Sequence, residues 1–258
     1  MTPLRPWIIQ HYESLATTMD RAELLARHGA PERTLVIANE QTAGRGRSGR
    51  TWQGEPGAAL QLTAILRPRI PPRHLPVLPL LVGVAVATAI EAASGAEARL
   101  KWPNDVWLGD DPERQKVAGI LMTSRLSAAG IEFVLVGIGV NVSTTLLHLP
   151  PGATSLREAT GWTGHPGELL DALLPALDRV YDDFVQTEGR PSLAEWRRRA
   201  ALLGELVSIE EHGARLTGML AGISDDGALL LETAEDELHR VISGDVVRGP
   251  RRVIISST

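Results

Sequence analysis

The chain of 258 residues has a formal net charge of -5 and contains no cysteine. The acidic balance gives no reason to expect bulk affinity for DNA. The lack of cysteine excludes disulfides, thiolate catalysis and cysteine-ligated metals. The length suffices for one sizeable domain and a small one, and the composition is that of a soluble globular protein. The N-terminus lacks the basic-then-apolar pattern of a signal peptide, so we expect a cytoplasmic protein.

The first helical pattern begins near Asp20, after a short extended segment. Thr17 and Thr18 stand directly before it, where helix caps belong. Their hydroxyls are expected either to cap the helix or to bind a polar ligand at the same helix end, and the sequence leaves both roles open. The β-branched run over residues 34–38 (TLVIA) then predicts a strand.

The segment Gln41–Trp52 (QTAGRGRSGRTW), the arginine–glycine loop, follows that strand. It contains no acidic residue and alternates glycines with arginines: Gly44, Arg45, Gly46, Arg47, Gly49 and Arg50. Glycines allow positive φ and a close approach of backbone to ligand. Three guanidiniums in one short loop repel each other unless an anion or solvent separates them. The pattern is not a phosphate-binding P-loop, because the Gly-Lys-Ser/Thr ending is absent. It predicts a flexible anion-binding loop, with a solvated surface loop as the alternative.

The next element is a strand over residues 58–66. An apolar run over residues 76–93 follows, in which Glu91 is the first charged residue; it is called the uncharged run below. A membrane span needs about 20 apolar residues. This run is shorter and begins with two prolines, so we expect no membrane span and interpret it as a helix buried against a sheet. Residues 98–108 predict two short strands joined at Pro103–Asn104, a turn-forming pair.

Two further strands are predicted at residues 116–125 and 132–142, after an acidic insert expected at the tip of a hairpin. Glycines within them indicate close backbone approach: Gly119, Gly137 and Gly139. Helices are predicted at residues 167–185 and 193–203. Short β runs follow, with a hairpin turn at Asp226–Gly227. We therefore expect two domains, residues 1–203 and 204–258.

Four motifs, in this order and at these spacings, resemble the biotin–protein ligases (biotin–[acetyl-CoA-carboxylase] ligases): QTAGRGRSGRTW, KWPNDVWL, KVAGIL and GIGVN. The resemblance implies an α+β fold. It consists of a class II synthetase-like catalytic domain, with a central mixed or antiparallel sheet flanked by helices, and a small C-terminal SH3-like β-barrel. Family members that repress biotin synthesis carry an N-terminal winged helix-turn-helix. Here the threonine region starts within the first twenty residues, so the form without that repressor domain is expected.

The resemblance also implies the reaction. Biotin and ATP form biotinyl-5′-AMP and pyrophosphate, and biotin then passes to a specific lysine of a biotin carboxyl carrier protein. Mg²⁺ is expected on the polyphosphate of ATP. The sequence contains no metal-ligand cluster of its own, which agrees with a metal that arrives with the nucleotide. Two departures keep the expected chemistry: Thr17 where the family often has serine, and the insert before Lys116.

Site residues are carried over position by position from the family. The biotin contacts implied are Thr17, Thr18, Gln41, Gly44, Arg45, Gly46, Arg47, Lys116 and Gly119. The ATP contacts implied are Arg47, Arg50, Trp52, Asn104 and Lys116. The catalytic residues implied are Arg47 and Lys116, and we add Asp105 as a hypothetical acceptor of the proton from the carrier lysine. No metal ligand is assigned.

Some assignments stay open. Trp52 is expected to stack on adenine or to pack in the core, and Trp102 and Trp107 are assigned to packing. Lys101 is either a phosphate contact or a surface charge. Asn141 lines the pocket or closes a strand end.

The arginine–glycine loop is expected to be mobile without ligand and to close over the adenylate. The β domain over residues 204–258 is expected either to contact ATP or the carrier protein or to serve stability alone. The alternatives to a biotin ligase are a lipoate–protein ligase and a non-catalytic biotin-sensing regulator. Homodimers are common in the family, and an edge strand is a candidate surface for one.

Overall fold

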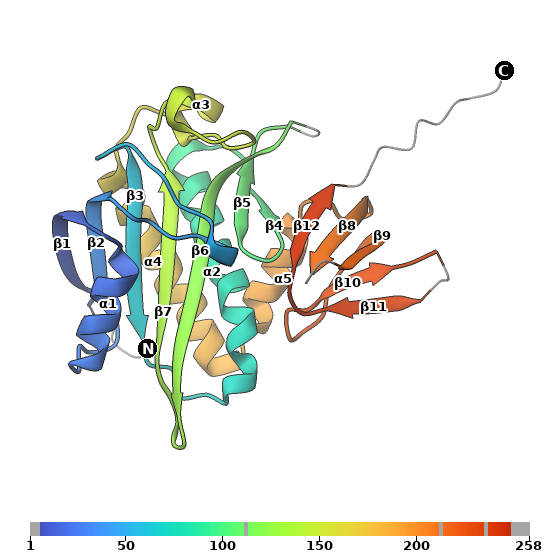
Figure 1. Cartoon of the computed structure of the whole chain (residues 1–258), viewed down its shortest axis with the longest axis horizontal. Helices are drawn as coiled ribbons and strands as arrows, with labels where there is room; N and C mark the ends of the chain where they lie inside the picture. Colours follow the sequence, from blue (N-terminus) through green and yellow to red (C-terminus); the bar gives the residue numbers. More distant parts are fainter. Residues whose placement is uncertain (1–5, 111–112, 212–213, 235–236, 249–258) are drawn as a thin grey trace.

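The computed structural model describes residues 6–110, 113–211, 214–234 and 237–248, and it contains two β-sheets (Figure 1). The larger sheet has seven strands in the order β1-β2-β3-β7-β6-β5-β4. Only β1 and β2 run parallel among its described pairs, so the sheet is mixed. Its strands are β1 (Ile8–Leu15), β2 (Thr34–Gln41), β3 (Ala59–Leu66), β4 (Arg99–Lys101), β5 (Asp105–Leu108), β6 (Gln115–Ser127) and β7 (Gly130–Asn141).

Helices cover both faces of this sheet. One face carries α1 (Thr18–Arg27), whose Met19, Ala22 and Ala26 pack on buried residues of β2, β3 and β7. The opposite face carries α2 (Leu78–Ser94) and α4 (Pro166–Thr187), which form the main core with the sheet. The remaining helices are α3 (Leu156–Thr160), α5 (Arg190–Arg199) and three 3-10 turns, η1 (Arg47–Gly49), η2 (Pro72–Val77) and η3 (Leu146–His148).

The uncharged run predicted as a buried helix is α2. Within the described residues, one helical segment, residues 72–94, is long and apolar enough to cross a membrane, and 72% of its most apolar 18-residue stretch is buried inside the protein. Leu78, Leu81 and Ile90 are fully buried against the sheet and α4. The helix stops at Gly95, whose φ of 72° is the left-handed cap that glycine accepts without strain. These features are those of a core helix.

The smaller sheet has five strands in the order β11-β10-β9-β8-β12, all antiparallel, and its fold agrees with the expected SH3-like barrel. It lies beside β4 and β5 (Figure 1). The buried Trp102 donates its indole N–H to the carbonyl of Gly227 at 3.0 Å, which fixes one sheet against the other. The strands are β8 (Leu206–Glu211), β9 (Ala214–Ile223), β10 (Leu229–Glu232), β11 (Leu238–Val241) and β12 (Asp245–Arg248).

The predicted fold class is confirmed, and most differences lie at element ends. Thr17 caps α1 by accepting from the Met19 N–H at 3.2 Å, as the pattern predicted. The helix predicted at residues 193–203 begins at Arg190 and ends at Arg199. The reason is tertiary pairing, because the Ala201 N–H donates to the Leu100 carbonyl at 2.8 Å and pulls the chain out of the helix. The acidic insert does join β5 to β6, but its residues 111–112 lie outside the described residues.

Candidate active site

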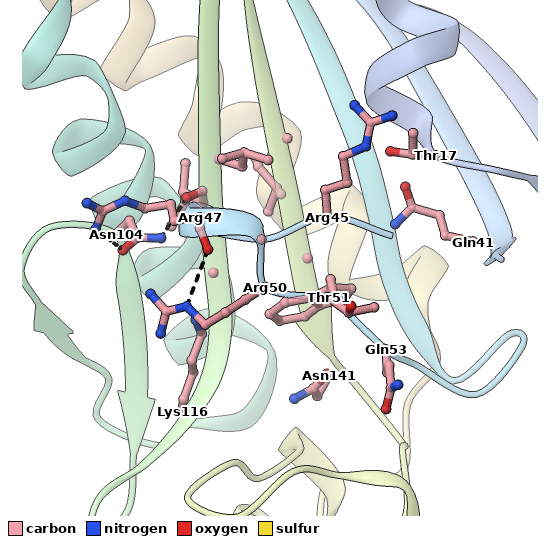
Figure 2. A pocket seen from close by; sticks show the side chains of 18 of the residues that line it. Thr17, Gln41, Arg45, Arg47, Arg50, Thr51, Gln53, Asn104, Lys116 and Asn141 are labelled. Atoms are coloured by element: carbon pink, nitrogen blue, oxygen red, sulfur yellow. Dashed lines mark hydrogen bonds between the residues drawn. The ribbon is translucent and has the colours of Figure 1, made fainter. Parts of the chain in front are cut away.

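Several strand ends and a helix N-terminus meet at one end of the larger sheet. The register Leu15↔Gln41 brings the ends of β1 and β2 together, and Ala59↔Asn141 joins the start of β3 to the end of β7. The N-terminus of α1 and the arginine–glycine loop lie over the same end. A cavity of about 440 Å³ lies there (Figure 2).

Most of the residues predicted from the sequence line this cavity. They are Thr17, Thr18, Gln41, Arg45, Gly46, Arg47, Arg50, Trp52, Asn104, Lys116 and Gly119. Gly44 and Asp105 do not line it but lie directly behind residues that do. A Cβ at Gly44 would meet the Trp52 carbonyl at 2.5 Å, so this glycine permits the tight return of the loop. Asp105 forms an ion pair with Lys116.

Three glycines lie in the floor of the cavity. Gly119 and Gly139 are register partners on β6 and β7, and Gly137 lies two residues before Gly139. A Cβ added at Gly139 would lie 2.5 Å from Trp52 Cε2, and one added at Gly119 would lie 3.2 Å from Trp52 Cζ3. The two glycines therefore allow the indole of Trp52 to pack directly on the sheet backbone. Trp52 both packs and lines the cavity.

One end of the cavity is a hydroxyl and amide network. The Gln41 side-chain oxygen accepts from the Thr18 N–H at 2.7 Å and from the Thr18 hydroxyl at 3.1 Å. The Thr18 hydroxyl accepts from Thr63 at 2.8 Å, and Gln41 donates to the Gln61 oxygen at 2.8 Å. Gln61 and Thr63 are buried on β3. Sequence analysis missed both, although two polar residues alternating in the apolar run AALQLTAIL were a signal.

The other end of the cavity is cationic. Arg47 Nη1 donates to the Asn104 side-chain oxygen at 3.1 Å, and the Asn104 amide donates to the Ile120 carbonyl at 2.8 Å. Asn104 thus fixes Arg47 on β6. Arg50 Nε donates to the Arg47 carbonyl at 3.3 Å (Figure 2). Asp245 of β12, which sequence analysis did not single out, pairs with Arg50 at 2.7 Å.

Lys116 and Lys101 extend this cationic end. Lys116 Nζ lies 2.6 Å from Asp105 Oδ1 and 5.6 Å from the ring centroid of Trp52. Lys101 lies over the ring of Trp107, with Nζ 4.9 Å from its centroid. Burial lowers the pKa of Lys101, which the neighbouring Lys116 lowers further and Asp105 opposes. Lys101 is therefore a partly buried member of the charge cluster and not an isolated surface charge.

Arg45 lies at the opposite end from Arg47. Figure 2 shows its side chain on the side of Thr17 and Gln41, while Arg47 points toward Asn104. Its guanidinium pairs with Asp20 of α1 at 2.7 Å, in a solvent-exposed contact. The predicted mutual repulsion of the loop arginines is thus relieved by acidic residues from outside the loop, Asp20 and Asp245.

The loop after β7 completes the wall, and sequence analysis missed it. Pro150, Pro151 and Ala153 line the cavity. The Asn141 amide donates to the Thr154 carbonyl at 3.0 Å, so Asn141 both lines the cavity and closes the strand end. The signal was positional, because the Pro-Pro-Gly run follows GIGVN at the sheet end that the arginine–glycine loop shares.

No group of three or more His, Cys, Asp or Glu side chains in the described part of the chain is placed to hold a metal ion. Two carboxylates, Asp105 and Asp245, lie among the cationic residues. Mg²⁺ prefers nucleotide phosphates plus one or two carboxylates. Both carboxylates are already paired with cations, which agrees with a Mg²⁺ that arrives on ATP and is held mainly by its phosphates.

Comparison with known proteins agrees with this geometry. Residues 12–141 match the model of the biotin/lipoate A/B protein ligase family, and residues 202–249 match that of the biotin protein ligase C-terminal domain. The chain is 41% identical over 203 residues to the biotin–[acetyl-CoA-carboxylase] ligase of Paracoccus denitrificans, covering 76% of this chain and 82% of that protein. It is 34% identical over 243 residues to the bifunctional ligase/repressor BirA of Bacillus subtilis, and the match covers 93% of this chain and 73% of that protein.

A solved structure is similar over almost the whole chain. The biotin protein ligase from Aquifex aeolicus in complex with biotin and ATP has a TM-score of 0.79 and 28% identity, covering 94% of this chain and 99% of that one. The second family model describes a domain of biotin protein ligases and is matched in addition to the shared biotin/lipoate model. The chain belongs to the biotin protein ligase family.

Proposed function

We propose that the chain joins biotin and ATP as biotinyl-5′-AMP and then transfers biotin to a lysine of a biotin carboxyl carrier protein. The observation that carries this proposal is the division of one cavity into two ends. A hydroxyl and amide network lies at Thr18 and Gln41, and a cationic cluster lies at Arg47, Arg50 and Lys116. The biotin protein ligase of Aquifex aeolicus is solved with biotin and ATP.

Biotin consists of a polar ureido ring and an apolar valerate chain. The ureido ring needs donors and acceptors, which Thr17, Thr18 and Gln41 supply. The valerate needs an apolar channel, which the glycine floor and the Trp52 ring supply. Such a division, an apolar pocket with a few placed polar groups, is usual for small-molecule sites. Biotin bound in this way directs its carboxylate toward Arg47 and Lys116.

The first step brings two anions together. A carboxylate oxygen attacks the α-phosphorus, an O–P bond forms, and pyrophosphate leaves with the electron pair of the broken bond. At about 4 Å, two unit charges repel by about 4 kcal/mol near a protein surface. Arg47 and Lys116 offset this repulsion at the reacting atoms, and Arg50 faces the departing phosphates. Mg²⁺ on the nucleotide would neutralise the leaving pyrophosphate.

The second step needs a neutral amine. The carrier lysine has a reference pKa of about 10.4 and must lose a proton before it attacks the acyl carbon, releasing AMP. Asp105 is our proposed proton acceptor, because its carboxylate lies 2.6 Å from Lys116 beside the reacting end of the cavity. Asp105 is paired with Lys116, so the role requires Lys116 to turn toward the phosphate.

Two further parts of the proposal concern the cell and the assembly. We propose that the enzyme acts in the cytoplasm, where ATP and carrier are available. A homodimer through β1 is also proposed, because β1 is an edge of the larger sheet and exposes Ile8 and Ile9. Sedimentation at several concentrations tests the dimer, and a monomer throughout would exclude it.

The enzyme assay is a mass measurement on a carrier domain incubated with biotin, ATP and Mg²⁺. We expect the wild type to add one biotin to the carrier and Lys116→Met to add almost none. Arg198→Met removes an exposed cation that does not line the cavity and serves as the matched control. A wild type that leaves the carrier mass unchanged, with adenylate formation also absent, would refute the proposed function.

A further inference from the structure

Asp245 reaches from the smaller sheet to the arginine–glycine loop. Its Oδ2 lies 2.7 Å from Arg50 Nη2, and its Oδ1 lies 3.6 Å from Arg47 Nη1. The neighbouring Gly244 carbonyl accepts from Arg47 Nη2 at 3.4 Å. Arg47 is therefore held from one side by Asn104 of the larger sheet and from the other by the start of β12.

The position of Asp245 is fixed by its own strand. Asp245 pairs with Glu210 of β8 in an antiparallel ladder. Gly244 before it has a φ of 130°, and a Cβ there would lie 2.6 Å from Ile209 Cγ2, so the chain turns into β12 where only glycine fits. The carboxylate thus stands on a rigid element.

The loop that receives this carboxylate is held by a few turn hydrogen bonds and by Asn104, and its tip is exposed. Arg47–Gly49 is a single 3-10 turn, Ser48 has a positive φ of 54°, and Arg50 is 60% exposed. Four cations lie around this point, Arg47, Arg50, Lys101 and Lys116, and Asp105 and Asp245 are the carboxylates that face them. Without Asp245 the four cations would face Asp105 alone, and their repulsion would push the loop arginines apart.

We infer that Asp245 is a positioning residue for the first half-reaction: it holds Arg47 and Arg50 side by side at the mouth of the cavity before the nucleotide arrives. This inference rests on the proposed function and extends it to the smaller sheet. Arg50 uses Nη2 for Asp245 and Nε for the Arg47 carbonyl, which leaves Nη1 for a phosphate. A guanidinium has five N–H donors, so one arginine can bind a carboxylate and a phosphate together.

The same geometry allows an opposite role, in which Asp245 competes with the phosphates for the arginines. The two roles predict opposite effects of Asp245 on the KM for ATP. A positioning residue lowers the KM for ATP, because the cations are ordered before binding and less freedom is lost on binding. A competing residue raises the KM for ATP. Removal of the Asp245 charge therefore distinguishes them.

The test is biotin-dependent ATP–pyrophosphate exchange with Asp245→Asn, Asp245→Glu and the matched control Glu210→Gln. Glu210 is the exposed partner of Asp245 in the ladder, so its change removes the same charge without touching the loop. For Asp245→Asn we expect the KM for ATP to rise roughly tenfold and the KM for biotin to change by less than about twofold. Asp245→Glu should recover part of the loss, and Glu210→Gln should behave as the wild type.

Three results would overturn the inference. A lower KM for ATP in Asp245→Asn would make Asp245 a competitor, and a KM equal to that of Glu210→Gln would give it no role. A defect that disappears at high Mg²⁺ would make it a metal ligand. Equal midpoints of thermal unfolding for Asp245→Asn and Glu210→Gln would show that the smaller sheet is intact in both. A wild type without any biotin-dependent exchange would refute the proposed function instead, and the two failures are thereby distinct.

Discussion

Gly139→Ala should damage the site by displacing Trp52. The added Cβ would lie 2.5 Å from Trp52 Cε2, 2.7 Å from Cζ2 and 2.8 Å from Nε1. Ordinary contact begins at 3.4 Å, so the ring must move by about 0.9 Å at its nearest atom. The indole ring is rigid, and the sheet backbone beneath it is held in place by the hydrogen bonds of its ladder. The ring therefore moves away from β7 and into the cavity.

The expected cost has two parts. Overpacking a site of this kind destabilises a protein by roughly 1–3 kcal/mol. The displaced ring also narrows the apolar channel and separates Trp52 from Lys116, whose Nζ lies 5.6 Å from the ring centroid. We expect the KM for both biotin and ATP to rise by about tenfold or more, because a loss of about 1.4 kcal/mol of binding free energy lowers affinity tenfold.

The comparison variant is Gly137→Ala, which adds the same methyl group to the cavity floor two residues away on the same strand. Its Cβ would meet Met19 Sδ at 3.0 Å, and a flexible thioether can give way by a few tenths of an ångström. Both variants make the same backbone change, so the difference between them reports Trp52. The assay is ATP–pyrophosphate exchange with each substrate varied, alongside thermal unfolding. Equal KM values for Gly139→Ala and Gly137→Ala would refute the packing argument.

Three further outcomes are expected. Arg47→Gly should release biotinyl-adenylate, which should then label the lysines of a lysine-rich bystander protein. The enzyme itself should stay almost unlabelled, because its only lysines are Lys101 and Lys116. Tight retention of the adenylate by this variant would argue against loop closure. Thr63→Val removes the hydroxyl that donates to Thr18 at 2.8 Å, so the KM for biotin should rise several-fold, and unfolding should be easier by about 1 kcal/mol, with the KM for ATP almost unchanged. The lowered pKa of Lys101 means that its ammonium deprotonates at a lower pH than that of a free lysine. The wild type should therefore lose ATP affinity in alkaline solution, and Lys101→Arg should keep more of it because a guanidinium stays charged. Identical pH profiles for the two would exclude Lys101 from the ATP end.

Local patterns in the sequence predicted the parts of the site that lie close together along the chain. The threonine before α1 does cap it, and the glycines of β6 and β7 do mark a close approach, here of the Trp52 ring. Resemblance to the family brought Thr18, Gln41, Arg47 and Lys116 to one cavity, where the structure places them.

Long-range pairing was the part that local patterns could not predict. Asp245 lies 195 residues from Arg50, and no periodicity links a strand start in one sheet to a loop in another. The predicted end of α5 was wrong for the same reason. Leu100 pairs with Ala200, and this pairing overrides a helical pattern that continues through Leu203. The roles of the site residues, and the closure of the arginine–glycine loop, stay predictions.

The most direct test of the two-ended cavity is ATP–pyrophosphate exchange by the wild type with biotin or with lipoate. Lipoate has a carboxylate and an apolar chain but no ureido group, so the polar end at Thr18 and Gln41 would remain unpaired. Sites built to hydrogen-bond a substrate reject analogues that lack the polar group, here by at least about a hundredfold. We predict rapid exchange with biotin and almost none with lipoate. Equal or faster exchange with lipoate would contradict the account.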